Sequence, residues 1–515
     1  MMRVAIVGAG PNGLFAAERL IAQLAAGGGR ADVTLFDPQP PGWGAGYRPD
    51  QPEWLRLNVN AAIVAADGGG AGRPSLGLPA FADWRRTHGE TDSLDPFPPR
   101  ALVGRYLIDC WQALLARLPP GVMLRHRAQR VTDLTPDHGA WLIEGASYDE
   151  VLLCTGHAGD WPGALRHGWS GTPPLVPRVY PVDEWLSEAR VPSGCTVVCR
   201  GAALTFIDAA LTLTQGRGGR FERDGYRASG AEPRRIVPVG RRGGFMQVKP
   251  DPGGPLGALD LRGPRDRGLQ ECAAAVGDVD RLLQVVWTTA AGYLALATDQ
   301  PAELPPPGTV PTPSGDPVDG LRRSLQVALG RRPPGVEWAL GQAWRDLYPA
   351  IVEAAGQQRV SASAWPGFAA AAAALEPIAF GPPPVNAAKL LALCEAGVVD
   401  AGHLAGEWTQ AVAAADVVID CVLPPPGLVA GQWPDTLAQH SVLVRAAGRR
   451  GIAVGPDGAC LTAAGEAVPG LSAVGRLTED VVIGNDTLSR TLHPATGRWA
   501  QRVAAACAAQ VVGAR

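Results

Sequence analysis

A glycine-rich turn between a short apolar strand and an amphipathic helix constrains the fold more than any other feature. Residues 4–7 form a continuous apolar run, which suits a central parallel strand buried on both faces. The turn Gly8-Ala9-Gly10-Pro11-Asn12-Gly13 follows, and apolar residues then recur at helical spacing to residue 25. A second apolar run at 33–36 ends at Asp37. This order predicts the first βαβ unit of a doubly wound, Rossmann-like α/β fold.

Each part of this unit has a reason in dinucleotide binding. Gly8 allows a sharp turn, Gly10 removes the Cβ that would block a pyrophosphate, and Gly13 lets helix and strand pack closely. The helix N-terminus supplies free N–H groups and the positive end of its dipole. Asp37 can bond a ribose hydroxyl. It lies 29 residues past Gly8, and the glycine-rich stretch 27–31 predicts an enlarged turn that absorbs the extra length.

A second glycine and aromatic loop at 41–47 leads into the segment 54–60. A flavoprotein must enclose its isoalloxazine ring, whereas a simple dinucleotide site needs no such extension. The alternation in this segment puts Arg56, Asn58 and Asn60 on one face of a short predicted strand. Their side chains either bond a flavin or substrate, or satisfy the loop backbone.

A second nucleotide-binding unit is predicted further along, in a less complete form. A strand at 151–154 stops at Thr155-Gly156-His157 and closes the first sheet. A new strand at 196–199 is followed by a turn and a helix from about residue 204 to 215. Gly201 is kept in this turn, but Ala203 stands where a second glycine is expected, and its methyl group can push a pyrophosphate away. The second site therefore tolerates Ala203, binds its ligand from other contacts, or is degenerate.

Arginine after this helix allows two interpretations. Arg217 can bind the 2′-phosphate that distinguishes NADP from NAD. The alternative is a solvated helix end capped by glycine and arginine.

The middle of the chain differs in texture. Proline runs separate helical patterns at 269–297, 318–329, 338–355 and 387–396, and residues 416–422 return to strand character. We therefore expect an FAD-binding domain at 1–190 and 440–515, an NAD(P)-binding-like domain at 191–262 and 411–439, and a helical insertion at 263–410.

Composition excludes several classes of partner. Hydrophobic residues make up 46% and charged residues 18% of the 515, enough for sizeable cores, and the net charge of −3 gives no reason to expect nucleic acid or an anionic membrane surface. Nine cysteines without a C-x-x-C pair argue against a disulfide framework and a metal site. The chain enters its first strand at residue 3 and has no long apolar run, so we expect a cytoplasmic protein without a signal peptide or membrane span. The sequence leaves the oligomeric state open.

Several segments, in this order, resemble a family of FAD/NAD(P)-binding proteins. The family includes a nitrosuccinate-forming aspartate N-monooxygenase and an FAD-dependent urate hydroxylase. The matching segments are 7–13, 57–60, 100–107, 155–157, 200–201 with 204–208, 216–221 and 486–490 with Trp499. The resemblance implies bound FAD, NADPH or NADH as reductant and O₂ as oxidant; Ala203 departs from the family pattern. From the residue pattern and the resemblance together, the cofactor-binding candidates are Gly8, Gly10, Asn12, Gly13, Asp37, Asn58, Asn60, Arg105, Thr155, Gly156, Gly201, Ala203, Arg217, Asp486, Thr487 and Leu488.

The implied function is an FAD-dependent monooxygenase that hydroxylates a small polar substrate, with N-hydroxylation of an amino acid such as aspartate as the first expectation. The flavin carries the chemistry, so the sequence names no catalytic residue. Arg56, Arg241 and Lys249 are candidates to hold a substrate carboxylate, or are surface residues. The alternatives are a flavin-binding protein, an oxidase or dehydrogenase without a working NAD(P)H site, and a urate-type C-hydroxylase. Asp486 and Thr487 either face the flavin or cap a helix.

Overall fold

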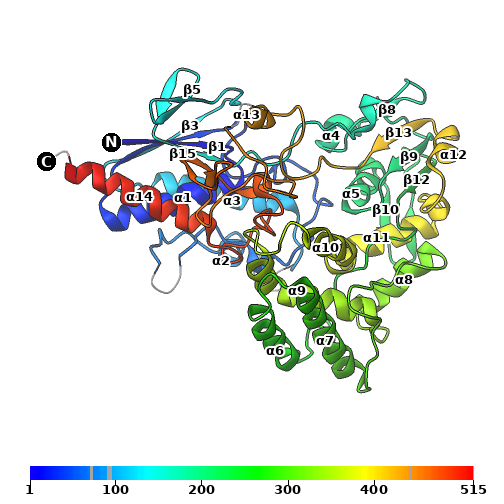
Figure 1. Ribbon diagram of the computed structural model, residues 1–515. Helices are drawn as coiled ribbons and strands as arrows, with labels where there is room; N and C mark the ends of the chain where they lie inside the picture. Colours follow the sequence, from blue (N-terminus) through cyan, green and yellow to red (C-terminus); the bar gives the residue numbers. More distant parts are fainter. Residues whose placement is uncertain (70–72, 90–94, 440–441, 514–515) are drawn as a thin grey trace.

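Two mostly parallel sheets and a helical body make up the computed structural model, which describes residues 1–69, 73–89, 95–439 and 442–513 (Figure 1). The first sheet has the strand order β14-β15-β7-β1-β2-β3, in which only the edge strand β14 is antiparallel to its neighbour. Its apolar strands are buried on both faces, as parallel strands covered by helices must be. The strands are β1 (Met2–Val7), β2 (Ala31–Phe36), β3 (Val122–Arg127), β7 (Glu150–Leu153), β14 (Ala459–Leu461) and β15 (Ala467–Ala473).

Strands from both ends of the chain share this sheet. β15 pairs in parallel with β7, and the C-terminal helix α14 lies beside α1 (Figure 1). Side chains of β1 alternate between two cores, which we call core 1, on the α1 side, and core 4, on the other face. The helices packed in core 1 are α1 (Pro11–Gly27), α2 (Phe81–Thr87), α3 (Arg100–Leu115) and α14 (Ala495–Gly513).

The second sheet has the order β12-β9-β13-β8, and all its strands are parallel. This confirms the predicted α/β class with two doubly wound folds. One face packs in core 2 with α5, and the other forms the smaller core 5. The elements are β8 (Leu175–Val176), α4 (Val182–Trp185), β9 (Thr196–Arg200), α5 (Leu204–Leu213), β12 (Arg235–Val239), α12 (Trp408–Ala413) and β13 (Val417–Asp420).

The range expected as one helical insertion divides between two cores. Four helices form core 3, and they are α6 (Arg262–Ala273), α7 (Val279–Thr298), α9 (Val336–Ala355) and α10 (Trp365–Ala379). Two others, α8 (Pro317–Ala328) and α11 (Pro384–Glu395), pack in core 2 against the second sheet. The predicted helix 269–297 is two helices, because Asp278 caps the start of α7 by accepting from the N–H of Arg281.

The second sheet begins before residue 191, since β8 lies within the range 1–190 that the sequence assigns to the first domain. The expected boundary at residue 440 lies outside the described residues. Short antiparallel strands complete the fold: β4 (Thr135–Asp137), β5 (Ala140–Ile143) and β6 (Ala146–Tyr148) form one sheet, and β10 (Arg220–Glu222) and β11 (Gly225–Arg227) another. No helix in the described part of the chain is long and apolar enough to cross a membrane.

Candidate cofactor site

The glycine turn after β1 is built for different reasons at each glycine. Gly8 has φ +101°, and a Cβ there would lie 2.2 Å from the carbonyl oxygen of Cys154. A Cβ at Gly13 would lie 2.0 Å from the carbonyl oxygen of Gly8. At Gly10, by contrast, a Cβ would meet only backbone atoms of Gly44, at ordinary contact distances of 3.5 and 3.9 Å. The packing of the protein therefore demands glycine at positions 8 and 13 but not at position 10.

Helix α1 begins beside a loop that carries an unpaired donor. Gly10 is the N-cap of α1, and within the described part of the chain no capping side chain bonds the first N–H groups of this helix. The loop 41–47 lies across the turn, since the Gly42 N–H donates to the Ala9 carbonyl at 2.7 Å. In this loop the buried Trp43 Nε1–H has no acceptor within the described part of the chain. Unsatisfied donors at a helix N-terminus suit an anionic pyrophosphate, so these residues fit the phosphates of FAD.

Asp37 stands at the end of β2, as the sequence predicts, but it already has partners. Its carboxylate accepts from the Ala9 N–H and from the Gln39 N–H, each at 2.9 Å. A carboxylate has about four acceptor sites, so it can still bond a ribose hydroxyl. Sequence reasoning missed its second role, which is to hold the glycine turn.

The segment 55–60 joins the two folds instead of forming a regular strand. Leu55 is buried in core 2 and Leu57 in core 1, and Arg56 makes only an isolated bridge with Pro99. The Asn60 side chain accepts from the Ala62 N–H at 2.9 Å. The loop backbone is thus the partner of Asn60 here.

Two of the three candidates for binding a substrate carboxylate, Arg56 and Lys249, are hydrogen-bonded to protein groups in or near this segment. Arg56 donates to the Phe97 carbonyl at 2.9 Å and forms an ion pair with Asp95. Lys249 is 6% exposed, and its Nζ donates to the Asn58 carbonyl. Burial, and then the charge of Arg345, lower the pKa of Lys249 to about 7. The structure therefore places a buried amine beside the 55–60 segment, while Arg56 turns to its own loop.

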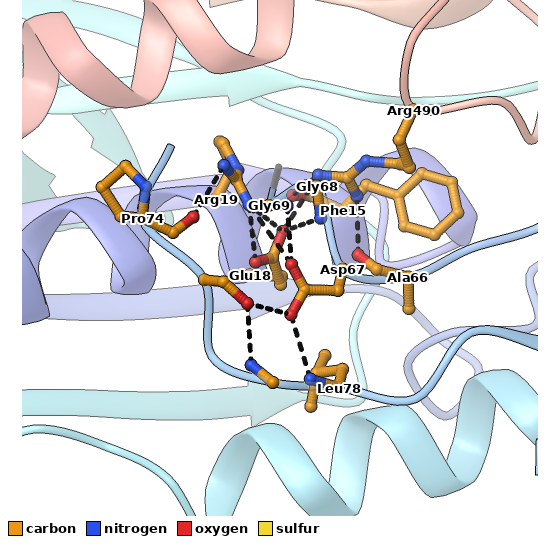
Figure 2. A network of polar contacts seen from close by, with 12 residues as sticks. Phe15, Glu18, Arg19, Ala66, Asp67, Gly68, Gly69, Pro74, Leu78 and Arg490 are labelled. Atoms are coloured by element: carbon orange, nitrogen blue, oxygen red, sulfur yellow. Dashed lines mark hydrogen bonds and ion pairs between the residues drawn. The ribbon is translucent and has the colours of Figure 1, made fainter. Parts of the chain in front are cut away.

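The C-terminal segment that carries Asp486, Thr487 and Leu488 is clamped to α1. Leu488 is buried in core 1, and Arg490 binds the buried Glu18 at 2.9 Å (Figure 2). Arg490 also donates to the Ala66 carbonyl at 3.1 Å, and its guanidinium lies 4.4 Å from the ring centroid of Phe15. The clamp fixes the segment whose preceding residues the sequence assigns to the flavin.

No helix begins at Asp486, because α14 starts only at Ala495. The Thr487 hydroxyl accepts from the Ser489 N–H at 2.9 Å, and Asn12 reaches the same region by donating to the Asn485 carbonyl at 3.5 Å. Asp486 is an exposed carboxylate 3.6 Å from the guanidinium of Arg476. The helix-cap interpretation of this pair is therefore wrong.

Charged residues near the C-terminal segment affect the pKa values of two side chains from other parts of the chain. Burial, partly offset by Arg100 and reinforced by Asp486, raises the pKa of Tyr47 to about 12. Burial, and then the charge of Arg476, lower the pKa of His157 to about 4. Arg476 in turn forms the ion pair with Asp486, so the segment that carries Asp486 contributes charge to both environments.

The second turn copies the first incompletely. Gly201 has φ +102°, like Gly8, and Ala203 caps α5 with the same extended backbone that Gly10 has at α1. Ala203 is exposed at the N-cap of α5, where it carries a methyl group that Gly10 lacks at α1. The position of the third glycine is taken by Phe206, which is fully buried in core 2. The second turn departs from the pattern at two positions, of which the sequence analysis noted one.

Arg217 lies at the opposite end of α5 from Ala203. Its guanidinium donates to the carbonyls of Val191 at 2.6 Å, Ala231 at 3.1 Å and Leu186 at 3.3 Å. Arg217 is thus half-buried and bonded to its own fold, and the 2′-phosphate role that the sequence suggests for it stays a prediction.

Arg241 and Arg242 follow β12 at a different place. β12 pairs in parallel with β9 up to Val239 opposite Arg200, so the exposed Arg241 lies at the same sheet edge as Gly201. The carboxyl edge of a parallel sheet is where such folds bind nucleotides. Arg241 thus follows a strand at the same sheet edge as the second turn, and its role toward a substrate carboxylate stays a prediction.

The remaining candidates are accessible. Gly156 follows β7 with φ +68° and is exposed next to the half-buried Thr155, and Arg105 is exposed on α3. Among the described residues, no group of three or more His, Cys, Asp or Glu side chains is arranged to hold a metal ion.

Residues 5–158 match the model of the FAD-NAD(P)-binding family. A nitrosuccinate-forming L-aspartate N-monooxygenase of Streptomyces cremeus is 32% identical over 288 residues, covering 47% of this chain and 42% of the relative. A nitrosuccinic acid synthase of Aspergillus oryzae is 32% identical over 281 residues, covering 48% of this chain and 41% of the relative. The chain thus spans less than half the length of these curated relatives. The reduced form of ornithine hydroxylase from Pseudomonas aeruginosa aligns over 99% of this chain and 100% of its own, with 12% identity and a TM-score of 0.45.

Proposed function

Because residues 5–158 match the FAD-NAD(P)-binding family, we propose that the chain is an FAD-dependent monooxygenase that uses NAD(P)H and O₂. The finer proposal is N-hydroxylation of the amino group of a small amino acid such as aspartate. Its support is the similarity to relatives named as aspartate N-monooxygenases. FAD, when bound, would accept a hydride from NAD(P)H and activate O₂ for transfer of a hydroxyl group.

The observation that carries the proposal is Gly10. Its neighbours leave room for a Cβ, so internal packing does not explain a glycine there. A ligand that approaches the backbone at the N-terminus of α1 does explain it. The uncapped N–H groups of α1 would hold the pyrophosphate, the Trp43 Nε1–H would donate to the cofactor, and Asp37 would bond a ribose hydroxyl.

Lys249 would hold the carboxylate of the substrate. Its amine lies at the seam between the two folds and has the Asn58 carbonyl as its acceptor. An arriving carboxylate would favour the charged amine and raise its pKa from about 7. Substrate binding at this place would therefore take up a proton near neutral pH.

NADPH would bind at the carboxyl edge of the second sheet. Gly201 supplies the turn and the N-terminus of α5 is uncapped, while Arg241 after β12 would bind the 2′-phosphate that NADH lacks.

The alternative is a flavoprotein without a working NAD(P)H site. The specific observation in its favour is that Ala203 and Phe206 replace two glycines, so the nucleotide backbone could not approach the second turn as closely as the first.

Anaerobic addition of NADPH to the purified, FAD-loaded protein distinguishes the monooxygenase from the flavoprotein without a working NAD(P)H site. Bleaching of the flavin absorbance supports the monooxygenase, and persistence of the oxidised spectrum under both NADPH and NADH supports the alternative. For the substrate, amino acids and purines should be compared for stimulated NADPH oxidation in air. Formation of a nitrogen-oxidised product from aspartate, detected by mass spectrometry, supports the finer proposal, and a hydroxylated purine would overturn it.

A further inference from the structure

A buried carboxylate on the second fold receives donors from two other parts of the chain. Asp208 lies on α5 and is 3% exposed. Arg100, the first residue of α3, donates to it and forms an ion pair with it. The hydroxyl of Tyr180 donates to the same carboxylate oxygen. The guanidinium of Arg100 also lies 5.6 Å from the ring centroid of Tyr180.

The three residues join the two nucleotide folds. α3 belongs to core 1 and α5 belongs to core 2, and Tyr180 packs against core 2 from the loop between β8 and α4 of the second fold. The contact between Arg100 and Asp208 therefore forms only at a particular orientation of one fold against the other.

Further contacts extend this seam. Trp54 donates from its indole to the Thr212 hydroxyl of α5 at 3.0 Å, and the Asn386 amide of α11 donates to the Trp54 carbonyl at 3.2 Å. On the outside, Arg48 pairs with the exposed Asp183 at 3.3 Å. The first fold is thus bonded to α5 in two places one helical turn apart.

A buried ion pair adds little net stability, because removing both charges from water costs about as much as their attraction returns. Its geometry is strict, however, so it disfavours other orientations in which a charge would be buried alone. A polar contact of this kind specifies an arrangement more than it stabilises the fold.

The position of Asp208 on α5 links the orientation of the two folds to the second nucleotide turn. Ala203 caps the same helix five residues earlier, about 7.5 Å along the axis at 1.5 Å per residue. Whatever fixes Asp208 against α3 also fixes the N-terminus of α5, which carries the second nucleotide turn.

We propose that Asp208 is a positioning residue, held by Arg100 and Tyr180, that sets the second nucleotide turn at the orientation needed for hydride transfer to the flavin. The proposal rests on the proposed function. Because transfer requires reacting atoms within about 3–3.5 Å, a displacement of about 1 Å can cost about 100-fold in rate.

The test replaces the whole polar contact by apolar side chains of similar size, with the triple variant Arg100→Met/Tyr180→Phe/Asp208→Leu. No buried group is left unpaired, so the melting temperature should stay within a few degrees of the wild type. In stopped flow without oxygen, reduction of the flavin by NADPH should slow at least 10-fold, while reduction by dithionite, which needs no docking, should be unchanged. The control Asp183→Asn removes an exposed ion pair across the same seam and should leave both rates unchanged.

Small-angle scattering of the unliganded protein gives a second measurement. The distribution of interatomic distances should be broader for the triple variant than for the wild type, because the two folds would take up more than one relative orientation. Should it misfold, Asp208→Asn keeps the shape of the side chain and should show the same selective loss of NADPH reduction. Equal NADPH rates and equal scattering in variant and wild type would overturn the inference. If the wild type is reduced by neither nicotinamide, the proposed function fails, and scattering alone then decides whether Asp208 fixes the orientation.

Discussion

The Asp37 carboxylate accepts a hydrogen bond of 2.9 Å from the Ala9 N–H, so the acid that ends β2 holds the glycine turn that ends β1. In the proposed FAD site, this one side chain would both shape the pyrophosphate-binding turn and bond the ribose. A charge-assisted bond of this kind contributes about 1.5–3 kcal/mol.

From this relationship we expect Asp37→Ala to weaken FAD binding by about 10- to 100-fold, the equivalent of that energy. Fluorescence titration of apoprotein with FAD measures the change. Asp32→Asn, at the other end of β2, is the matched control and should bind FAD normally. Equal affinities in all three proteins would mean that Asp37 contributes nothing to the site.

Substitution of two glycines of the first turn should have different effects, on stability for Gly13 and on FAD binding for Gly10. Gly13→Ala puts a Cβ 2.0 Å from the Gly8 carbonyl oxygen, and we expect it to lower the free energy of unfolding by at least about 2 kcal/mol. Gly10→Ala has room within the protein, so the apoprotein should melt near the wild-type temperature and bind FAD poorly. Calorimetry of the apoprotein with FAD titration checks both; normal FAD binding by Gly10→Ala would contradict our reason for that glycine.

Cofactor preference should depend on the arginine after β12. Arg241→Ala should raise the KM for NADPH several-fold and leave the KM for NADH unchanged, because only NADPH carries the 2′-phosphate. Arg217→Ala removes bonds to three carbonyls and should lower the melting temperature without changing the ratio of the two KM values. Binding of 2′,5′-ADP against 5′-ADP, followed by calorimetry, provides a measurement independent of turnover. Arg241 would have no role in selecting NADPH if its variant lost both ligands equally.

Ala203→Gly should lower the KM for NADPH and leave FAD content unchanged, because it removes an exposed methyl group from the N-cap of α5, where the nucleotide is proposed to approach the backbone. Steady-state kinetics and the flavin absorbance of the purified variant measure the two quantities. A variant reduced by NADPH when the wild type is not would show that the natural site is degenerate.

The depressed pKa of Lys249 predicts a pH dependence of stability. The folded amine loses its proton near pH 7, whereas the unfolded one keeps it to about pH 10.4. Between these values the unfolded state binds more protons, so stability rises with pH. Wild type should gain up to about 2 kcal/mol relative to Lys249→Met between pH 7.5 and 9, at about 1.36 kcal/mol per unit. Denaturant unfolding of both proteins tests this, and parallel pH curves would show that the buried amine stays charged.

Local pattern determined much of this protein. The apolar run, the turn and the acid of residues 4–37 require a βαβ unit, because spacing along the chain fixes what a strand, a tight turn and a helix can accommodate. The roles of Gly8 and Gly13 follow from the same local geometry. For the same reason, the apolar runs at 151–154, 196–199 and 416–422 predict strands, and the structure has a strand of one of its two parallel sheets in each.

Partners remote in the sequence were decided only by the tertiary structure. Nothing in the sequence shows that Arg217 reaches three carbonyls, that Lys249 meets Asn58, or that Asp37 turns back to Ala9. The contact of Arg100 with Tyr180 and Asp208 exists only because two folds formed by different parts of the chain pack together. A side chain's local pattern states what it can bind, and the packing of distant elements determines which of those partners it meets.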